Sequence, residues 1–79
     1  MQAIRTRFHG PTNTMGSRYS AQAEAGKKTF SADYSLAYQD NHKQAAYDFA
    51  NSLNWLERGE TLEGGQFGND FYWVIVPKN

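Results

Sequence analysis

The residues best suited to chemistry lie in one segment, which runs from Gly10 to Arg18 and reads Gly-Pro-Thr-Asn-Thr-Met-Gly-Ser-Arg. Its two glycines let backbone amides come close to a ligand, and its hydroxyls and carboxamide can donate hydrogen bonds. Arg18 can make a bidentate contact with phosphate. The segment is not a Walker A loop, because five residues separate its glycines and a strand, not a helix, is expected next.

We therefore expect this segment to bind the phosphate of a small molecule. The alternative is an ordered surface connection whose Asn and Thr side chains hydrogen-bond to their own backbone. The candidate ligand-binding residues are Thr12, Asn13, Thr14, Gly16, Ser17 and Arg18 of this segment, together with Arg7 and His42.

His42 stands one helical turn before Ala46, at the predicted start of a helix. The helix dipole disfavours a charged imidazole there, so a neutral His42 could donate to a ligand oxygen or stack on a base. The alternative is a partly buried histidine bonded to backbone. Arg7 shares a strand face with Arg5 and could form a cationic rim with Arg18, although strand arginines also serve solubility or edge protection alone.

Neither metal binding nor catalysis is expected. His9 and His42 are the only histidines, their spacing matches no metal motif, and the chain has no cysteine. The acids Glu57, Glu60 and Glu63 lie in a polar connection, and no Ser-His-Asp pattern or carboxylate pair is recognisable. We therefore expect no catalytic residue, no metal, no cofactor and no enzymatic activity.

The composition is that of one small domain, residues 1–79, without a disulfide scaffold. Eight basic residues balance eight acidic ones, which argues against a DNA mimic and against a strongly basic duplex-binding protein. The charge is uneven, because residues 1–43 carry six basic and three acidic residues and residues 44–79 carry two and five. No apolar run is long enough for a signal peptide or a membrane span, so a soluble intracellular protein without a membrane partner is expected.

Alternation of apolar and polar residues predicts strands over residues 2–8, 18–25 and 28–34. A turn over residues 25–28 would place the apolar residues of the second and third strands on one face. That register pairs Ala23 with Phe30, Ala21 with Ala32 and Tyr19 with Tyr34.

A helix is predicted from Asp40 or Asn41, with Asn41 as its cap and Gln44 completing a capping box. Its apolar stripe comprises Ala46, Phe49, Ala50 and Leu53, and the helix ends near Trp55.

Two further strands are predicted over residues 61–66, a weak and glycine-broken pattern, and 70–76, with Gly68-Asn69 as the turn between them. The last strand is apolar on both sides, so it should be central in the sheet or contribute to a dimer interface. Most aromatic residues should be core, and Tyr72 or Trp73 is expected to be exposed for stacking. The predicted fold is α+β, with a mostly antiparallel β-β-β-α-β-β sheet and one helix on one face.

The Asn13-to-Arg18 segment, the Asn-His-Lys-Gln-Ala-Ala run at the helix start and the Gly64-Gly65 pair resemble a group of small uncharacterised proteins of bacteriophages and prophages. The resemblance covers nearly the whole chain. Members of that group typically have glycine before the tryptophan that closes the helix, whereas this chain has Asn54. Small phage proteins of this size are often counter-defence factors, and that is the role the resemblance implies.

These observations lead to an expected function. The chain is expected to be a counter-defence protein of the host cytoplasm that sequesters a nucleotide immune signal without catalysis, at a site between the protomers of a homo-oligomer. One alternative is a protein-binding inhibitor of a host defence complex, of the anti-CRISPR or anti-restriction type. The others are a single-stranded nucleic-acid binder and a structural virion protein.

Overall fold

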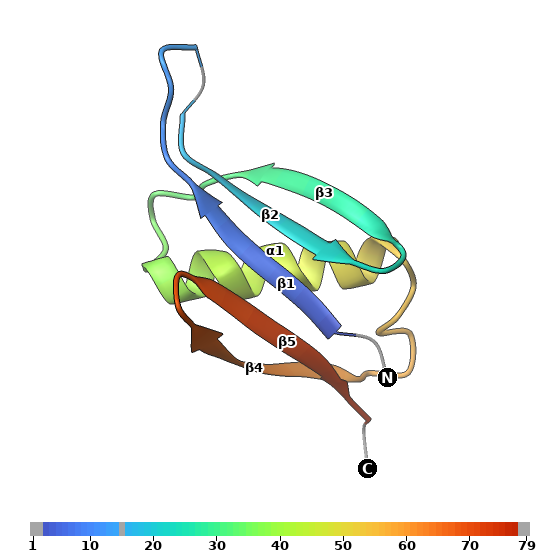
Figure 1. Cartoon of the computed structure of the whole chain (residues 1–79). Coiled ribbons are helices and arrows are strands. Elements are labelled where there is room, and N and C mark those ends of the chain that lie inside the picture. The colour runs from blue at the N-terminus through green and yellow to red at the C-terminus, as the bar shows by residue number, and fades with distance from the viewer. Residues whose placement is uncertain (1–2, 15, 78–79) are drawn as a thin grey trace.

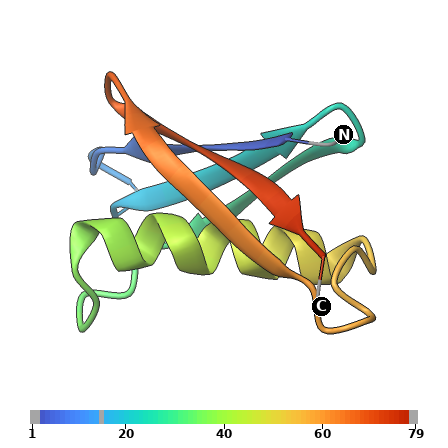
Figure 2. The ribbon, with the colours of Figure 1, turned by 90° about the horizontal axis from the view of Figure 1, so that it is seen from below.

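Over the residues that the structure describes, 3–14 and 16–77, five strands form one sheet and a single helix covers one of its faces (Figures 1 and 2). This computed structural model confirms the predicted α+β class and the order β-β-β-α-β-β. The elements are β1 (Ala3–His9), β2 (Arg18–Ala23), β3 (Gly26–Ser31), α1 (Tyr38–Ser52), β4 (Thr61–Phe67) and β5 (Asp70–Val76).

The strands lie side by side in the order β3-β2-β1-β5-β4, and every neighbouring pair is antiparallel. The first strand is therefore central and pairs with the last, where Thr6 lies opposite Phe71. The strand β5 lies between β1 and β4, which confirms that it is an interior strand. Its bounds and the Gly68-Asn69 turn before it are as predicted, and Gly68 takes a positive φ of 64° there.

The hairpin of β2 and β3 differs from the prediction in its register. Its turn is Glu24-Ala25, so that Ala23 pairs with Gly26, Ala21 with Lys28 and Tyr19 with Phe30. The predicted partner of each residue was wrong by four residues, although the faces were assigned correctly because the shift is even and side chains alternate with a period of two. Gly26, at φ 148°, lets the tight turn close.

The third strand ends at Ser31 because the chain turns before the helix. The Asp33 carboxylate accepts hydrogen bonds from the backbone N and the hydroxyl of Ser35, at 2.9 and 2.6 Å from Oδ1, as in an Asx turn. The Asn41 side chain accepts from Asp33 N and donates to Asp33 O, both at 2.9 Å. The predicted extension of this strand to Tyr34 was therefore wrong.

The helix begins at Tyr38, two residues before the earliest predicted start, with Ala37 at its cap position and no side-chain cap. Asn41 is not the cap that we predicted, because its buried side chain fastens the preceding turn to the helix. The capping box is also absent, since Gln44 Nε2 donates to Asp48 Oδ1 at 2.9 Å.

The helix ends as the sequence predicts, before Trp55. Asn54 takes the left-handed conformation, with φ 60°. Its N–H donates to Asn51 O and the Trp55 N–H donates to Ala50 O, the two bonds of a Schellman motif. Asparagine is the residue other than glycine that takes this conformation most readily, so it can end the helix in this way.

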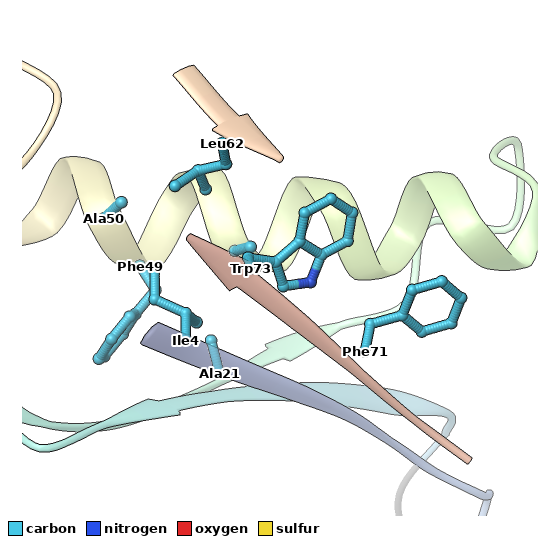
Figure 3. Packing of buried hydrophobic residues seen from close by; sticks show 8 residues of the cluster. Ile4, Ala21, Phe49, Ala50, Leu62, Phe71 and Trp73 are labelled. Atoms are coloured by element: carbon cyan, nitrogen blue, oxygen red, sulfur yellow. The ribbon is translucent and has the colours of Figure 1, made fainter. Parts of the chain in front are cut away.

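The core lies between the sheet and the helix, and its side chains come from β1, β2, α1, β4 and β5 (Figure 3). Of the predicted helix stripe, Ala46, Phe49 and Ala50 are buried and Leu53 is packed against the core. On β5, Phe71 and Trp73 point towards the helix, whereas Tyr72 and Val74 are exposed on the outer face of the sheet.

Candidate functional site

Residues 10–14 and 16–17, which we call the finger, project from one end of the sheet between β1 and β2 (Figure 1). The base of the finger is tied to the segment after β3. Ala32 N donates to Ser17 O at 3.0 Å, and Ser17 N donates to the Tyr34 hydroxyl at 3.3 Å. A Cβ on Gly16 would lie 3.2 Å from that hydroxyl, so glycine fits closely there. The fold thus positions the base of the finger against Tyr34.

Four of the predicted ligand-binding residues meet at the base of the finger. Thr14, Gly16, Ser17 and Arg18 line one hollow of about 350 Å³, whose other wall consists of Ser31, Ala32 and Tyr34. Thr12 and Asn13 are exposed further out on the finger. The Thr12 hydroxyl accepts a long hydrogen bond from Thr14 N, at 3.4 Å, which is the self-satisfying loop contact of the alternative interpretation.

Arg7 lies apart from this hollow and forms an ion pair. Its Nε and Nη2 atoms donate to the two carboxylate oxygens of Asp70, each at 3.0 Å. The Arg7 guanidinium holds the pKa of the Asp70 carboxyl below its ordinary value. Arg5 similarly donates to Gln22 Oε1 at 2.8 Å. The predicted cationic rim is thus divided, with Arg18 in one hollow and a carboxylate-bound Arg7 elsewhere.

His42 is not part of the finger site, and the prediction that it contacts a ligand was wrong. It is fully buried, and its Nδ1 lies 2.7 Å from Thr6 Oγ1 in a shared hydrogen bond. Aromatic rings of Tyr19, Tyr38 and Phe71 surround it, with centroids 4.3–4.8 Å from the imidazole. The sequence placed His42 on the helix correctly, but its side chain points into the core and not out of the helix end.

The burial of His42 predicts a loss of stability in acid. Burial lowers the pKa of His42 from 6.5 to about 4, because a charged imidazole would be desolvated among the rings. Below pH 6.5 the unfolded chain therefore takes up a proton that the folded chain does not take up until about pH 4. The contribution of the neutral His42 to the free energy of unfolding is fully present above pH 6.5. It falls by a total of about 3 kcal/mol as the pH is lowered from 6.5 to about 4.

Chemical denaturation of the wild type and of His42→Phe between pH 7 and pH 4 measures this loss. The free energy of unfolding of the variant should fall much less between pH 7 and pH 4. Some fall remains, because the pKa of His9 is also lowered, by burial and by Lys27. Equal slopes in the two proteins would show that His42 does not carry the effect.

The sequence analysis missed that several large aromatic side chains are exposed at the finger end. Tyr34 and Phe67 are 79% and 78% exposed, and Phe8, Tyr38 and Tyr72 about 40%. The sequence predicts that most aromatic residues belong to the core, and Phe8 and Tyr34 are among those that do not. Tyr72 is exposed as expected, whereas Trp73 is buried. The exposure of Tyr34 depends on tertiary contacts that the local sequence does not reveal. The strand β3 ends at Ser31, before Tyr34, and the turn that follows places the tyrosine ring at the surface.

These rings line two further hollows. One, of about 290 Å³, lies between the base of the finger and α1 and is lined by residues that include Phe8, Ser17, Tyr34 and Tyr38. The other, of about 610 Å³, lies at the β4–β5 turn and is lined by Arg7, Phe8, Tyr38, Phe67, Gly68, Asn69, Asp70 and Tyr72. Guanidinium groups and aromatic rings therefore line the hollows of one end of the molecule.

A histidine and a serine also meet on the outer face of the sheet. His9 Nε2 and Ser20 Oγ share a hydrogen bond of 2.9 Å, which is the distance between a general base and a nucleophile. However, Ser20 is only 4% exposed and lines none of the three hollows at the finger end. The pair therefore satisfies a buried hydroxyl and a half-buried imidazole and lies outside these hollows.

Within residues 3–14 and 16–77, no three His, Asp or Glu side chains come together as metal ligands. No helix in these ranges is long and apolar enough to cross a membrane. Comparison with protein-family models, with curated proteins and with solved structures finds no match to this chain.

Proposed function

We propose that the protein binds a phosphate-bearing nucleotide at the finger end and acts by sequestering it, without chemical turnover. The observation that carries the proposal is the hollow at the base of the finger, in which Gly16, Ser17 and Arg18 face an exposed Tyr34. A nucleotide presents an anionic phosphate and a flat base, and this hollow holds groups for both.

The phosphate would lie on the β2 side of the hollow. The Arg18 guanidinium supplies planar donors for a bidentate contact, and the hydroxyls of Ser17 and Ser31 supply further donors.

The base would stack on Tyr34. Its ring is largely exposed, while its hydroxyl accepts the hydrogen bond from Ser17 N, so the ring is oriented at the edge of the hollow. Stacking of a base on an aromatic side chain contributes about 1–3 kcal/mol and does not depend on base identity. Binding, in this proposal, needs no catalytic group.

The biological role that we attach to such binding is phage counter-defence in the host cytoplasm, by capture of a nucleotide immune signal. This part of the proposal is supported by the resemblance of the Asn13-to-Arg18 segment to the phage proteins. We further propose that the protein is a homo-oligomer, supported by the exposed Tyr72 and Val74 on the sheet face that the helix leaves uncovered (Figure 2). Sedimentation should show an oligomer at micromolar concentration that Val74→Asp disrupts, and a monomeric wild type would contradict association.

A thermal-shift screen with cyclic and linear nucleotides tests the binding proposal, with inorganic phosphate as the ligand control. A nucleotide at 100 times its dissociation constant should add about 2.7 kcal/mol, and each kcal/mol raises the Tm of so small a domain by about 4–8 °C. Arg18→Ala should abolish the shift. Arg58→Ala, in the connection 53–60 at the opposite end of the molecule (Figure 1), should retain it.

Two further variants separate binding from folding. Arg18→Lys keeps the charge but loses the planar fork, so it should weaken the shift without abolishing it. Tyr34→Ala should weaken the shift by nucleotides. A flat response across the panel, or a full shift in Arg18→Ala, would contradict the proposal and would favour a protein partner instead.

A further inference from the structure

The three hollows at the finger end adjoin one another. Ser17, Ala32 and Tyr34 line both the hollow at the finger base and the one next to α1. Phe8 and Tyr38 in turn line both that middle hollow and the one at the β4–β5 turn. We call this row of adjoining hollows the finger groove.

The two ends of the finger groove are chemically similar. At one end Arg18 lies beside the exposed Tyr34, and at the other end Arg7 lies beside Tyr72 and the exposed Phe67. The end hollows, of about 350 and 610 Å³, are each in the range of about 300–1,000 Å³ that small-molecule sites occupy. The groove therefore repeats, at its two ends, the pairing of a cation with an aromatic platform.

The β4–β5 end holds an ion pair. Both carboxylate oxygens of Asp70 accept hydrogen bonds from Arg7, so the charge of Arg7 is balanced there. The exposed rings of this end, Phe67 and Tyr72, lie 6.4 Å apart in an edge-on arrangement. This end suits a base more than a phosphate.

We infer that the ligand of the finger groove carries at least two nucleobases joined through phosphate, as in a dinucleotide or a short oligonucleotide. This inference rests on the proposed function. One base stacks on Tyr34 with its phosphate on Arg18, and the chain then follows the rings of Phe8 and Tyr38 to a second base on Phe67 and Tyr72. A mononucleotide fills one end of the groove only.

Isothermal titration of the full chain with three probes tests the inference: AMP, the 5′-phosphorylated dinucleotide pApA and the trinucleotide pApApA. The dinucleotide should bind at least about fivefold more tightly than AMP, since one added stacked base contributes at least that much. Phe67→Ala should weaken pApA about tenfold and leave AMP unchanged. The matched control is Thr61→Ala, which shortens an exposed side chain of β4 that lines none of the three hollows.

The outcomes separate this inference from the proposed function. If AMP and pApA bind equally and Phe67→Ala changes neither, the inference is overturned and nucleotide binding at the finger base stands. If Phe67→Ala weakens AMP, the single nucleotide lies at the β4–β5 end and the inference is likewise overturned. If none of the three probes binds, the nucleotide proposal fails together with it. Because Phe67 is 78% exposed, its removal should leave the Tm of the free protein nearly unchanged, which is measured alongside.

Discussion

Replacing Gly64 with alanine is expected to lower the free energy of unfolding by about 3 kcal/mol. Gly64 lies opposite Trp73 in the pairing of β4 with β5. A Cβ at Gly64 would lie 2.3 Å from Tyr72 O and 2.6 Å from the Trp73 ring atom Cε3, closer than atoms can approach without displacement. The contact is to backbone and to a buried ring, so neither neighbour can move aside easily.

Gly65→Ala is the matched control for this prediction. A Cβ at Gly65 would meet no atom within 4 Å, and its backbone does not have a positive φ. Alanine there should leave the stability unchanged or raise it slightly, because it restricts the unfolded chain. Thermal unfolding of both variants should give a fall of about 12–24 °C in Tm for Gly64→Ala alone. A similar small effect at both positions would show that the indole does not pack on Gly64.

Thr6→Val is expected to destabilise the protein by about 3 kcal/mol, although valine is more apolar and favours strands. Thr6 is fully buried on the central strand β1. Its hydroxyl accepts a hydrogen bond from Trp73 Nε1 at 3.0 Å and shares another with His42 Nδ1 at 2.7 Å. Valine keeps the shape and leaves both nitrogens buried without a partner.

Thr6→Ser separates the hydroxyl from the methyl group. Serine keeps both hydrogen bonds and loses one methyl, which should cost about 1 kcal/mol. Equilibrium unfolding should therefore rank the serine variant as more stable than the valine variant. In the His42→Phe background, Thr6→Val should lower the free energy of unfolding by less than in the wild type, since only Trp73 then loses its hydrogen-bond partner. A valine variant as stable as the wild type would mean that the hydroxyl contributes nothing.

Gly64 and Thr6 both lie next to the Trp73 indole. The Trp73 indole donates to Thr6 Oγ1 on β1, while it also covers Gly64 on β4. A side chain at Gly64 would displace the indole from this position. We therefore expect the effects of Gly64→Ala and Thr6→Val to be less than additive.

The sequence predicts the elements of this fold better than their contacts. The pattern of residues 70–76 and the Gly68-Asn69 turn are local signals, and the structure has both as predicted. The Glu24-Ala25 turn was missed because moving the turn by two residues shifts the pairing by four, and any even shift keeps each apolar side chain on its face, so periodicity alone does not select the register. Gly64-Gly65 looked like a weakness of a strand, whereas at Gly64 the small residue makes room for an indole from the next strand.

The candidate site could be predicted only in part. The finger residues from Thr14 to Arg18 are adjacent in the chain, so their meeting at one hollow follows from local sequence. The partners of His42 and Arg7 depend on pairing across the sheet, which brings Thr6 and Asp70 to them from distant positions. The exposure of Tyr34 depends on where β3 ends, and the Asn41 side chain on the helix determines that end.

The most direct test of nucleotide binding at the finger end is a ¹H–¹⁵N NMR titration of this 9 kDa chain with pApA. The account predicts amide shifts at Gly16, Ser17 and Arg18 at the finger base and at Gly68 in the β4–β5 turn. It predicts little change at Gly26 and Gly59, at the opposite end of the molecule. Shifts confined to that opposite end, or no shifts at millimolar pApA, would contradict the finger end as a nucleotide-binding site.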